Sequence, residues 1–363
     1  MKTKSSCFLF LSLFLSVLIF DSSLAAAADN LIFAVTYIRH GDRAPYSKID
    51  TPKLQYQWPY GIGELTPEGM HQEYLLGKEL RSRYIDMFHL LPPTYKNNTM
   101  YVLSTDYSRT IISAESLLLG FYPPGTGPKL SDGATALPNA FQPVPVRTIT
   151  GKQKNIIRPE QQDPEQFKLL MDNYSHTQKA WNEENSKLTA DFKKWGKILD
   201  KQLNTFDDFL IAADTIRCAS LHGLPLPAGL TKADVAKILN AADYLTALQY
   251  VPQPVAYFMA SGFLSQLNAD FRSAAAGTQQ YSYILYSGHD TALCGIMSAL
   301  GKPLAINPPY ASHIDFELYK NDSNYFVKVR YNGEPVKFSD KTTNDSLTLK
   351  DFSQLLEPYL IKN

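Results

Sequence analysis

The chain has 363 residues, of which 44% are hydrophobic, and its 35 basic residues are balanced by 35 acidic ones. This composition is that of an ordinary globular protein with enough apolar material for one large core or two modest ones. With no basic excess and a pI near 7, nucleic acid is excluded as the main partner.

The N-terminal residues 1–27 are predicted to be a secretory signal peptide. Lys2 and Lys4 precede an apolar run from Cys7 to Phe20, and small residues follow at 25–28. The run is short for a bilayer span, so we favour cleavage over an uncleaved anchor. No second long apolar run follows, so we expect no membrane span after signal removal. The expected location is secreted, or the lumen of a lysosome or vacuole.

A buried strand is predicted over 31–38, and a charged motif follows it directly: Arg39-His40-Gly41-Asp42-Arg43-Ala44-Pro45. A phosphate ester repels an incoming electron pair, and guanidinium forks relieve this repulsion by binding the non-bridging oxygens. The motif therefore predicts His40 as a nucleophile that attacks phosphorus, with Arg39 and Arg43 as phosphate ligands. The alternative is a polar turn after a strand.

Strand and helix then alternate, which is an α/β pattern. A helix is predicted from Thr66 to Phe88, with Thr66 as N-cap and Pro67 in the first helical position. A strand over 100–103 and a helix over 108–120 follow. Arg109 at the start of this second helix is a candidate third phosphate ligand, and the alternative is a solvated helix charge. Residues 121–164 are rich in Pro and Gly and predict loops and crossing strands.

Residues 165–273 change to long, polar segments with helical periodicity, including a capping box that begins at Thr231. We expect them to form a helical cap domain. The predicted architecture is therefore an α/β catalytic core built from residues 28–164 and 274–363, with the helical cap of residues 165–273 inserted into it.

The α/β pattern resumes with a strand over 281–286 that ends at Ser287-Gly288-His289-Asp290. A helix to about 300, a hairpin over 314–331 and a terminal helix complete the chain. Open α/β sheets bind ligands at the carboxyl ends of their strands, so this motif and the first one are expected to meet in one crevice. The alternative for Asp290 is a helix N-cap, whose pKa would be lowered.

The two motifs together predict a two-step phosphate transfer. His40 would form a phosphohistidine while Asp290 protonates the departing alcohol, and water activated by the same carboxyl group would then release phosphate. Arg39, Arg43, Arg109 and His289 would hold the phosphate oxygens. Since Asp290 must be protonated at the start, turnover is expected to favour acidic conditions.

A metal site is the competing interpretation of His and Asp pairs at two strand ends. Three arginines beside these side chains would oppose a cation, and no recognisable metal-ligand spacing is present. We therefore predict no metal and no cofactor. The histidines at 71, 89, 176 and 222 lie on predicted polar helix faces or in loops, and we assign them no role.

Secretion would also affect the cysteines and the glycosylation sequons. Without the signal peptide, Cys218 and Cys294 either form one disulfide or are two buried thiols, and we slightly favour the disulfide. Four N-glycosylation sequons are present, at Asn97, Asn173, Asn321 and Asn344.

The paired motifs resemble the histidine acid phosphatase family, in particular its prostatic and lysosomal acid phosphatase branch. Further similarity to that branch spans most of the mature chain, in the segments 58–70, 104–110, 121–124 and 308–312. The resemblance implies an α/β fold of three layers, of the phosphoglycerate mutase type, with an inserted and mainly α-helical cap. It also implies the roles given above for His40, Asp290 and the phosphate ligands, no metal, small-molecule phosphomonoesters and phosphopeptides as substrates, and a homodimer.

Two positions depart from the branch. Leu103 stands where the branch commonly has an arginine, so the charge at the pocket entrance is expected to be altered. His313 stands where a cysteine is expected, which puts the disulfide pairing of the family in doubt here.

Three functions fit the residues. The favoured one is a secreted or lysosomal-type acid phosphatase, a hydrolase of phosphomonoesters. A phytase-like or lysophosphatidate-type phosphatase of the same family is the first alternative, although no basic cluster for a polyphosphate is evident. A catalytically inactive secreted binding glycoprotein is the second, but such a protein has no need of the complete set of site residues.

Overall fold

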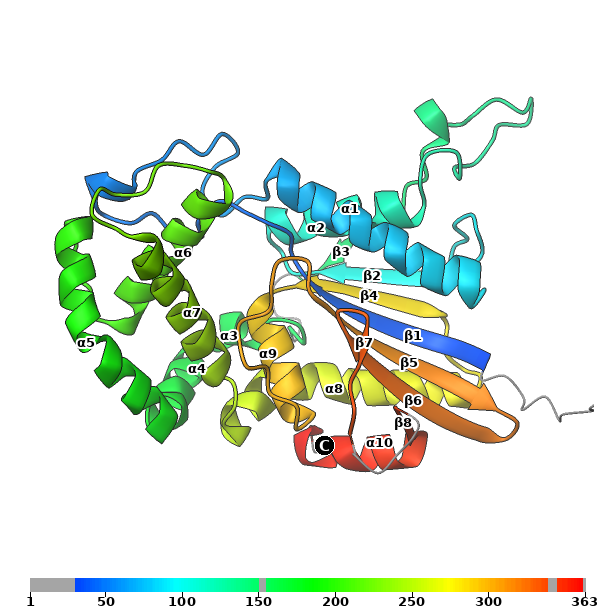
Figure 1. The fold of residues 1–363 in the computed structure, drawn as a ribbon. Coiled ribbons are helices and arrows are strands. Elements are labelled where there is room, and N and C mark those ends of the chain that lie inside the picture. Colours follow the sequence, from blue (N-terminus) through cyan, green and yellow to red (C-terminus); the bar gives the residue numbers. More distant parts are fainter. Residues whose placement is uncertain (1–29, 150–154, 339–344, 362–363) are drawn as a thin grey trace, which may run out of the picture.

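The computed structural model of the chain describes residues 30–149, 155–338 and 345–361. It shows a sheet covered by helices on both faces, with a group of further helices to one side (Figure 1). The predicted signal peptide at 1–27 and the sequon at Asn344 lie outside the described residues. Among the described residues, no helix is long and apolar enough to cross a bilayer.

The sheet has the strand order β3-β2-β4-β1-β5-β6-β7, with β8 paired to β6. The strands are β1 (Asn30–Arg39), β2 (Met100–Ser104), β3 (Arg147–Thr148), β4 (Tyr283–Gly288), β5 (His313–Asn321), β6 (Asn324–Tyr331), β7 (Glu334–Pro335) and β8 (Ser346–Thr348). β4 runs parallel to both β1 and β2, with Arg39 opposite Gly288 and Ser104 opposite Ser287. The carboxyl ends of these three strands therefore meet at one edge of the sheet.

Alternate residues of β1 enter separate cores on the two faces of the sheet. Phe33, Val35 and Tyr37 pack with α8 (Gln253–Ala275), α9 (Asp290–Ala299) and α10 (Leu349–Leu356). Ala34 and Ile38 pack with α1 (Pro67–Arg81) and α2 (Ser108–Phe121) on the opposite face. This alternation is the period of two expected for a strand buried on both faces. The predicted three-layer α/β core is confirmed.

The predicted helix over 66–88 begins as expected and changes its winding before its end. The Thr66 side chain accepts a hydrogen bond from the backbone N–H of Gly69, and Pro67 takes the first helical position. The α-helix ends at Arg81 and continues as one π-helical segment, Ser82–Met87. Short 3₁₀ turns occur at Pro52–Leu54, Pro138–Ala140 and Glu357–Tyr359.

The further helices lie to one side of the sheet, and the three longest of them share a core of their own. They are α3 (Pro159–Gln162), α4 (Pro164–Leu170), a π-helical turn at Met171–Ser175, α5 (Lys179–Leu199), α6 (Phe206–Leu221) and α7 (Lys232–Leu248). Trp181, Trp195 and Phe209 lie in this core. The predicted capping box at Thr231 begins α7, and a second at Thr205 begins α6.

Most of helix α8 falls inside the segment 165–273 that was expected to form the cap, yet its apolar side packs on the sheet. Phe263 and Phe271 belong to the same core as Phe33 and Val35 of β1, and α8 runs along the lower face of the sheet in Figure 1. We propose that the cap ends before α8 and that α8 belongs to the catalytic core.

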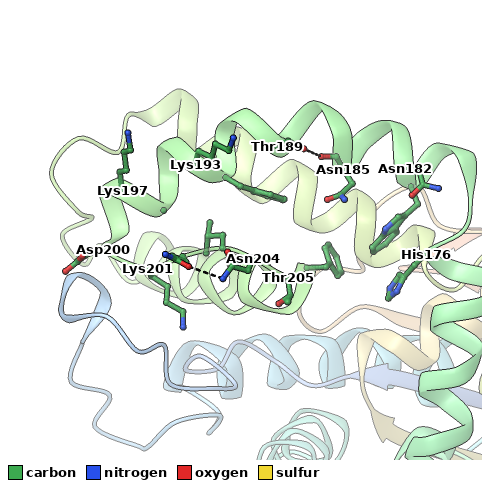
Figure 2. A pocket seen from close by; sticks show the side chains of 16 residues that line it. His176, Asn182, Asn185, Thr189, Lys193, Lys197, Asp200, Lys201, Asn204 and Thr205 are labelled. Atoms are coloured by element: carbon green, nitrogen blue, oxygen red, sulfur yellow. Dashed lines mark hydrogen bonds between the residues drawn. The ribbon is translucent and has the colours of Figure 1, made fainter.

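The cap contains a cavity of about 990 Å³ between α5 and the start of α6. Figure 2 shows Asn182, Asn185 and Thr189 along α5 on one side and Asn204 and Thr205 on the other. None of the predicted site residues lines this cavity.

The predicted disulfide is wrong, because both cysteines are free and buried. Cys218 on α6 lies in the cap, where its thiol is 3.3 Å from the Arg43 carbonyl oxygen. Cys294 on α9 belongs to a different apolar cluster, with Met171 and Met259. Each thiol behaves as a small buried apolar group.

Glu73 on α1 is a buried carboxyl group with no protein partner. The residue is 0% exposed, and neither carboxylate oxygen has a hydrogen-bond partner in the described part of the chain. Burial raises the pKa of Glu73 well above its usual value, so the folded protein favours the protonated, neutral form.

We predict that Glu73→Gln raises the melting temperature more at neutral than at acidic pH. The unfolded carboxyl ionises above about pH 4.3 while the folded one stays protonated, so stability falls as pH rises from that value to the raised pKa. Gln is neutral at every pH and avoids this loss. Thermal melts between acidic and neutral pH test this, with Glu115→Gln at an exposed site of α2 as control. An equal shift at all pH values would contradict the prediction.

Candidate active site

All six predicted site residues line one cavity of about 260 Å³ at the carboxyl edge of β1, β2 and β4. Arg39 is the last residue of β1, and His40 and Arg43 follow it. Arg109 comes from the first turn of α2, and His289 and Asp290 form the N-cap and first residue of α9. The predicted convergence of the two motifs is therefore observed.

The imidazole of His40 is held in one orientation by its own loop. Nδ1 lies 2.8 Å from the carbonyl oxygen of Gly41, and since a carbonyl only accepts, Nδ1 carries the proton and Nε2 keeps its lone pair. The loop packs closely on α1: a Cβ on Gly41 would collide with the Gly69 backbone. The Gly41 N–H donates to the Ser113 hydroxyl at 3.2 Å. These contacts leave Nε2 free for a ligand.

The surroundings of His40 keep it neutral. Burial is the largest cause that lowers its pKa well below the usual value, and the positive charges of Arg39, Arg43 and Arg109 lower it further. A neutral imidazole therefore persists in acidic solution, where an exposed histidine would be protonated.

Two of the arginines are paired with carboxylates. The Arg39 guanidinium is 2.9 Å from Asp290 and also donates to the Pro308 carbonyl oxygen. Arg43 binds both oxygens of Asp214, at 3.0 and 3.1 Å. Since Asp214 lies on α6, this pair joins the catalytic motif to the cap.

Arg109 has no carboxylate within ion-pair distance in the described ranges. Its guanidinium donates to the Gly63 carbonyl oxygen at 3.4 Å. Burial and the neighbouring charges of Arg43 and Arg158 lower the pKa of Arg109 to about 10. A buried cation next to other cations is stabilised by an anion, so this guanidinium favours anion binding.

Asp290 is ionised in this arrangement. Burial favours its protonated form, but the charge of Arg39 outweighs burial and holds the pKa of Asp290 below its usual range. One oxygen accepts from Asn307 at 3.0 Å, and the other accepts from the Thr291 N–H at 3.0 Å. The helix-cap alternative predicts a lowered pKa for Asp290, in agreement with this arrangement. Asp290 can therefore act as a proton donor only after its surroundings change.

His289 is buried against two donors. Its Nε2 lies 2.7 Å from the Arg158 guanidinium and 3.0 Å from the Thr105 hydroxyl, and its ring is 5.5 Å from that of His40. Burial, and then the charge of Arg158, lower the pKa of His289 well below its usual value. His289 is therefore neutral like His40.

Sequence reasoning missed three residues that contact the site: Arg158, Asp214 and His222. The His222 ring nitrogen Nε2 is 2.7 Å from a carboxylate oxygen of Asp42, and the Thr66 hydroxyl donates to the same oxygen at 2.5 Å. Each missed residue lies at a helix end or on a helix with an ordinary polar pattern, and no local motif marks it. Asp42, Glu68 and His222 are also close enough together to ligate a cation, but the 2.7 Å contact is already a satisfied hydrogen bond.

The expectation that Leu103 alters the charge of the pocket entrance stays a prediction. Leu103 is buried in the core of the sheet face that α8 covers, and it does not line the 260 Å³ cavity. An apolar side chain suits this position because it contacts other apolar side chains.

Residues 30–332 match the histidine phosphatase superfamily (branch 2). The chain belongs to this family. Human prostatic acid phosphatase is 31% identical over 362 residues, which cover 96% of this histidine phosphatase and 90% of the relative. Bovine lysosomal acid phosphatase is 30% identical over 349 residues, with coverages of 93% and 79%. The predicted family and the predicted enzyme class, acid phosphatase, are confirmed.

Solved structures of the same fold include phytases. The phytase from Citrobacter braakii has a TM-score of 0.67 and 17% identity, covering 92% of this histidine phosphatase and 98% of that chain. The apo form of the Hafnia alvei phytase has a TM-score of 0.66 and 17% identity, with coverages of 93% and 98%. At these identities the likeness shows the fold.

We predict that Arg109→Met raises the melting temperature of this histidine phosphatase in phosphate-free buffer. Removing the cation relieves its repulsion with Arg43 and Arg158, and a gain of a few degrees corresponds to about 1 kcal/mol. The stabilisation that added phosphate gives should shrink in the same variant, because an anion ligand is lost. Paired melts with and without phosphate test both effects.

Arg147→Met is the control for this experiment, because Arg147 is exposed on β3. A lower melting temperature for Arg109→Met without phosphate, together with an unchanged response to phosphate, would overturn the interpretation of Arg109 as an anion ligand.

Proposed function

We propose that this enzyme hydrolyses phosphomonoesters in acidic solution through a phosphohistidine on His40. The observation that carries the proposal is the neutral imidazole of His40, with Nδ1 fixed on Gly41 and Nε2 free beside three guanidinium groups. This geometry supplies a nucleophile and stabilises the negative charge of the transition state.

Substrate binding comes first in the proposed mechanism. The phosphate oxygens bind Arg39, Arg43, Arg109 and His289. Arg109 supplies a charge that no carboxylate of the described residues neutralises, so the phosphate completes an ion pair there. The cavity of about 260 Å³ holds the phosphate and the first part of the alcohol group.

The first chemical step forms a bond between His40 Nε2 and phosphorus and breaks the bond from phosphorus to the ester oxygen. That oxygen takes a proton from Asp290 and leaves as the alcohol. In the second step Asp290, now a carboxylate, accepts a proton from water, whose oxygen bonds to phosphorus as the bond to Nε2 breaks. Inorganic phosphate is released and His40 is restored.

The proton of Asp290 arrives with the substrate. Without a ligand, Arg39 keeps Asp290 ionised. A bound phosphate shares Arg39 and brings negative charge next to the carboxylate, and both effects raise the pKa of Asp290. A phosphomonoester carries its own proton below its second pKa of about 6. Acidic conditions therefore supply the protonated substrate, which explains the expected acid preference.

The cavity favours small monoesters over polyphosphates. Two of its cations, Arg43 and Arg217, are already paired with Asp214 and Asp243 from the cap. A substrate with several phosphates would have to compete with these carboxylates. Phosphopeptides with an exposed phosphate are compatible with the same cavity, whereas the phytase-like alternative has no such support beyond the shared fold.

The remaining properties of the enzyme are proposed on the sequence and the relatives. We propose a secreted or lysosomal glycoprotein that works without a cofactor and forms a homodimer. Asn97 and Asn173 are exposed and Asn321 is partly exposed, which supports glycan attachment at these three sequons.

We predict that His40→Ala reduces turnover of p-nitrophenyl phosphate by at least about 10³-fold, because no other side chain replaces the nucleophile. Enzyme quenched in alkaline denaturant should carry a base-stable, acid-labile phosphoryl group that the variant lacks. Addition of a chelator should leave the rate of the unaltered enzyme unchanged. Undiminished turnover in His40→Ala would exclude the proposed mechanism.

We predict that Asp290→Asn separates substrates by their leaving groups. Hydrolysis of glycerol phosphate should fall by about 10²- to 10⁴-fold, since an alkoxide needs a proton to depart. Formation of phosphoenzyme from p-nitrophenyl phosphate should fall far less, because nitrophenolate leaves without one. Rapid-quench kinetics with both substrates measure this difference.

Asp243→Asn is the matched control, because Asp243 lines the same cavity and pairs with Arg217. Its effect should be similar for both substrates. An equal loss for both substrates in Asp290→Asn would show that Asp290 only binds or positions.

A further inference from the structure

Arg158 contributes a fourth guanidinium next to the phosphate site, from outside both motifs. It is the N-cap residue of α3, and its backbone N–H donates to the side-chain oxygen of Asn155 at 2.8 Å. The same oxygen accepts the N–H of Ile157 at 3.3 Å. The backbone is thus held in a local turn that directs the side chain toward the cavity that it lines.

The contact of Arg158 with His289 defines where the imidazole proton lies. The guanidinium nitrogen is 2.7 Å from Nε2, and a guanidinium has hydrogens to donate but no lone pair to accept. Nε2 must therefore be unprotonated, and the proton of the neutral ring must be on Nδ1. The Thr105 hydroxyl, 3.0 Å from the same nitrogen, is able to donate to it as well.

Aromatic stacking and an acidic neighbour hold Arg158 in place. Its guanidinium lies 4.5 Å from the centre of the Tyr107 ring, and that of Arg109 lies 4.6 Å from the same ring. Tyr107 also meets His289 edge to face at 5.5 Å. Glu160 is 3.4 Å from the guanidinium of Arg158, whose side chain is only 20% exposed. Few other orientations are open to a side chain with these contacts.

We propose that Arg158 is a positioning residue that fixes His289 as the neutral tautomer with its proton on Nδ1, so that Nδ1 donates to a phosphate oxygen of the substrate. The inference deepens the proposed function and rests on it for the identity of the acceptor. A ring with the opposite tautomer would present a lone pair to the phosphate and would repel it.

The groups around His289 act in the same direction. The charged ones that face it are Arg158 on α3, Arg109 on α2 and Arg43 after β1, and the titratable ring of His40 lies beside them. Burial and these groups lower the pKa of His289. Asp290 follows it in the chain but is paired with Arg39. Acidic solution therefore leaves the ring neutral and its Nδ1 proton in place.

The tautomer is tested directly by NMR of the protein with ¹⁵N-labelled histidine, with the His289 signals assigned from a His289→Asn variant. The unaltered protein should show protonated Nδ1 and unprotonated Nε2 throughout the range of about pH 4 to 7 around the usual histidine pKa. In Arg158→Met, His289 should gain protonated Nε2 as the pH is lowered. Arg217→Met removes another arginine of the same cavity, one that pairs with Asp243, and should keep the tautomer of the unaltered protein.

Kinetics then connect the tautomer to phosphate binding. Arg158→Met should lower kcat/KM for glycerol phosphate by about 10- to 100-fold, the range expected for a charge-assisted hydrogen bond. The loss should shrink at lower pH, because a protonated His289 again carries a hydrogen on Nδ1 that it can donate to the phosphate. Arg158→Lys keeps a charged donor and should recover part of the loss.

A purely structural Arg158 would give a lower melting temperature with the His289 tautomer and the pH profile unchanged, and that result would overturn the proposal. If the unaltered protein hydrolysed no phosphomonoester, the proposed function would fail, while the NMR result would still decide whether Arg158 sets the tautomer of His289. The two failures are therefore distinguishable.

Discussion

The site depends on positive charge that the fold gathers at the ends of three parallel strands. Guanidinium groups repel each other when buried, so the fold must hold them in place by other contacts. Arg39 and Arg43 have carboxylate partners, at 2.9 and 3.0 Å, whereas Arg109 and Arg158 stack over Tyr107. The close packing of Gly41 on Gly69 fixes the loop that carries His40 and Arg43. The site is therefore organised for an anion before the anion arrives.

Burial and the same positive charges set the protonation states of the site. Burial first, and then the arginines, keep His40 and His289 neutral, whereas Arg39 keeps Asp290 ionised. This is the right state for the nucleophile and the wrong state for the acid. A bound phosphate that shares Arg39 favours the protonated form of Asp290 and leaves His40 neutral. Its negative charge acts most strongly on the neighbouring carboxylate. One charge distribution thus serves binding, nucleophilicity and, once substrate is bound, proton donation.

The sequence predicted the site residues that belong to local motifs. It missed the site residues that come from distant segments of the chain. The two motifs each follow a buried strand, and the rule that parallel strand ends share an edge was enough to place His40 beside His289. Asp214, His222 and Arg158 were missed, because their contacts span 171, 180 and 131 positions of the chain. The pattern of polar residues along a helix does not show which charged side chain faces the interior of the protein. The cysteines were misjudged for the same reason, since pairing depends on a separation that only the fold determines.

The cap supplies residues of the site that the α/β core does not contain. Its helix α6 supplies Asp214 to Arg43 and, at its C-terminal end, His222 to Asp42, so two residues of the nucleophile motif are bound to the cap. The Arg43 fork is bidentate toward Asp214, and a phosphate oxygen that approaches the same guanidinium must share its N–H groups. Substrate binding and the core–cap contact therefore compete for one side chain, while the His222–Asp42 contact is free of that competition.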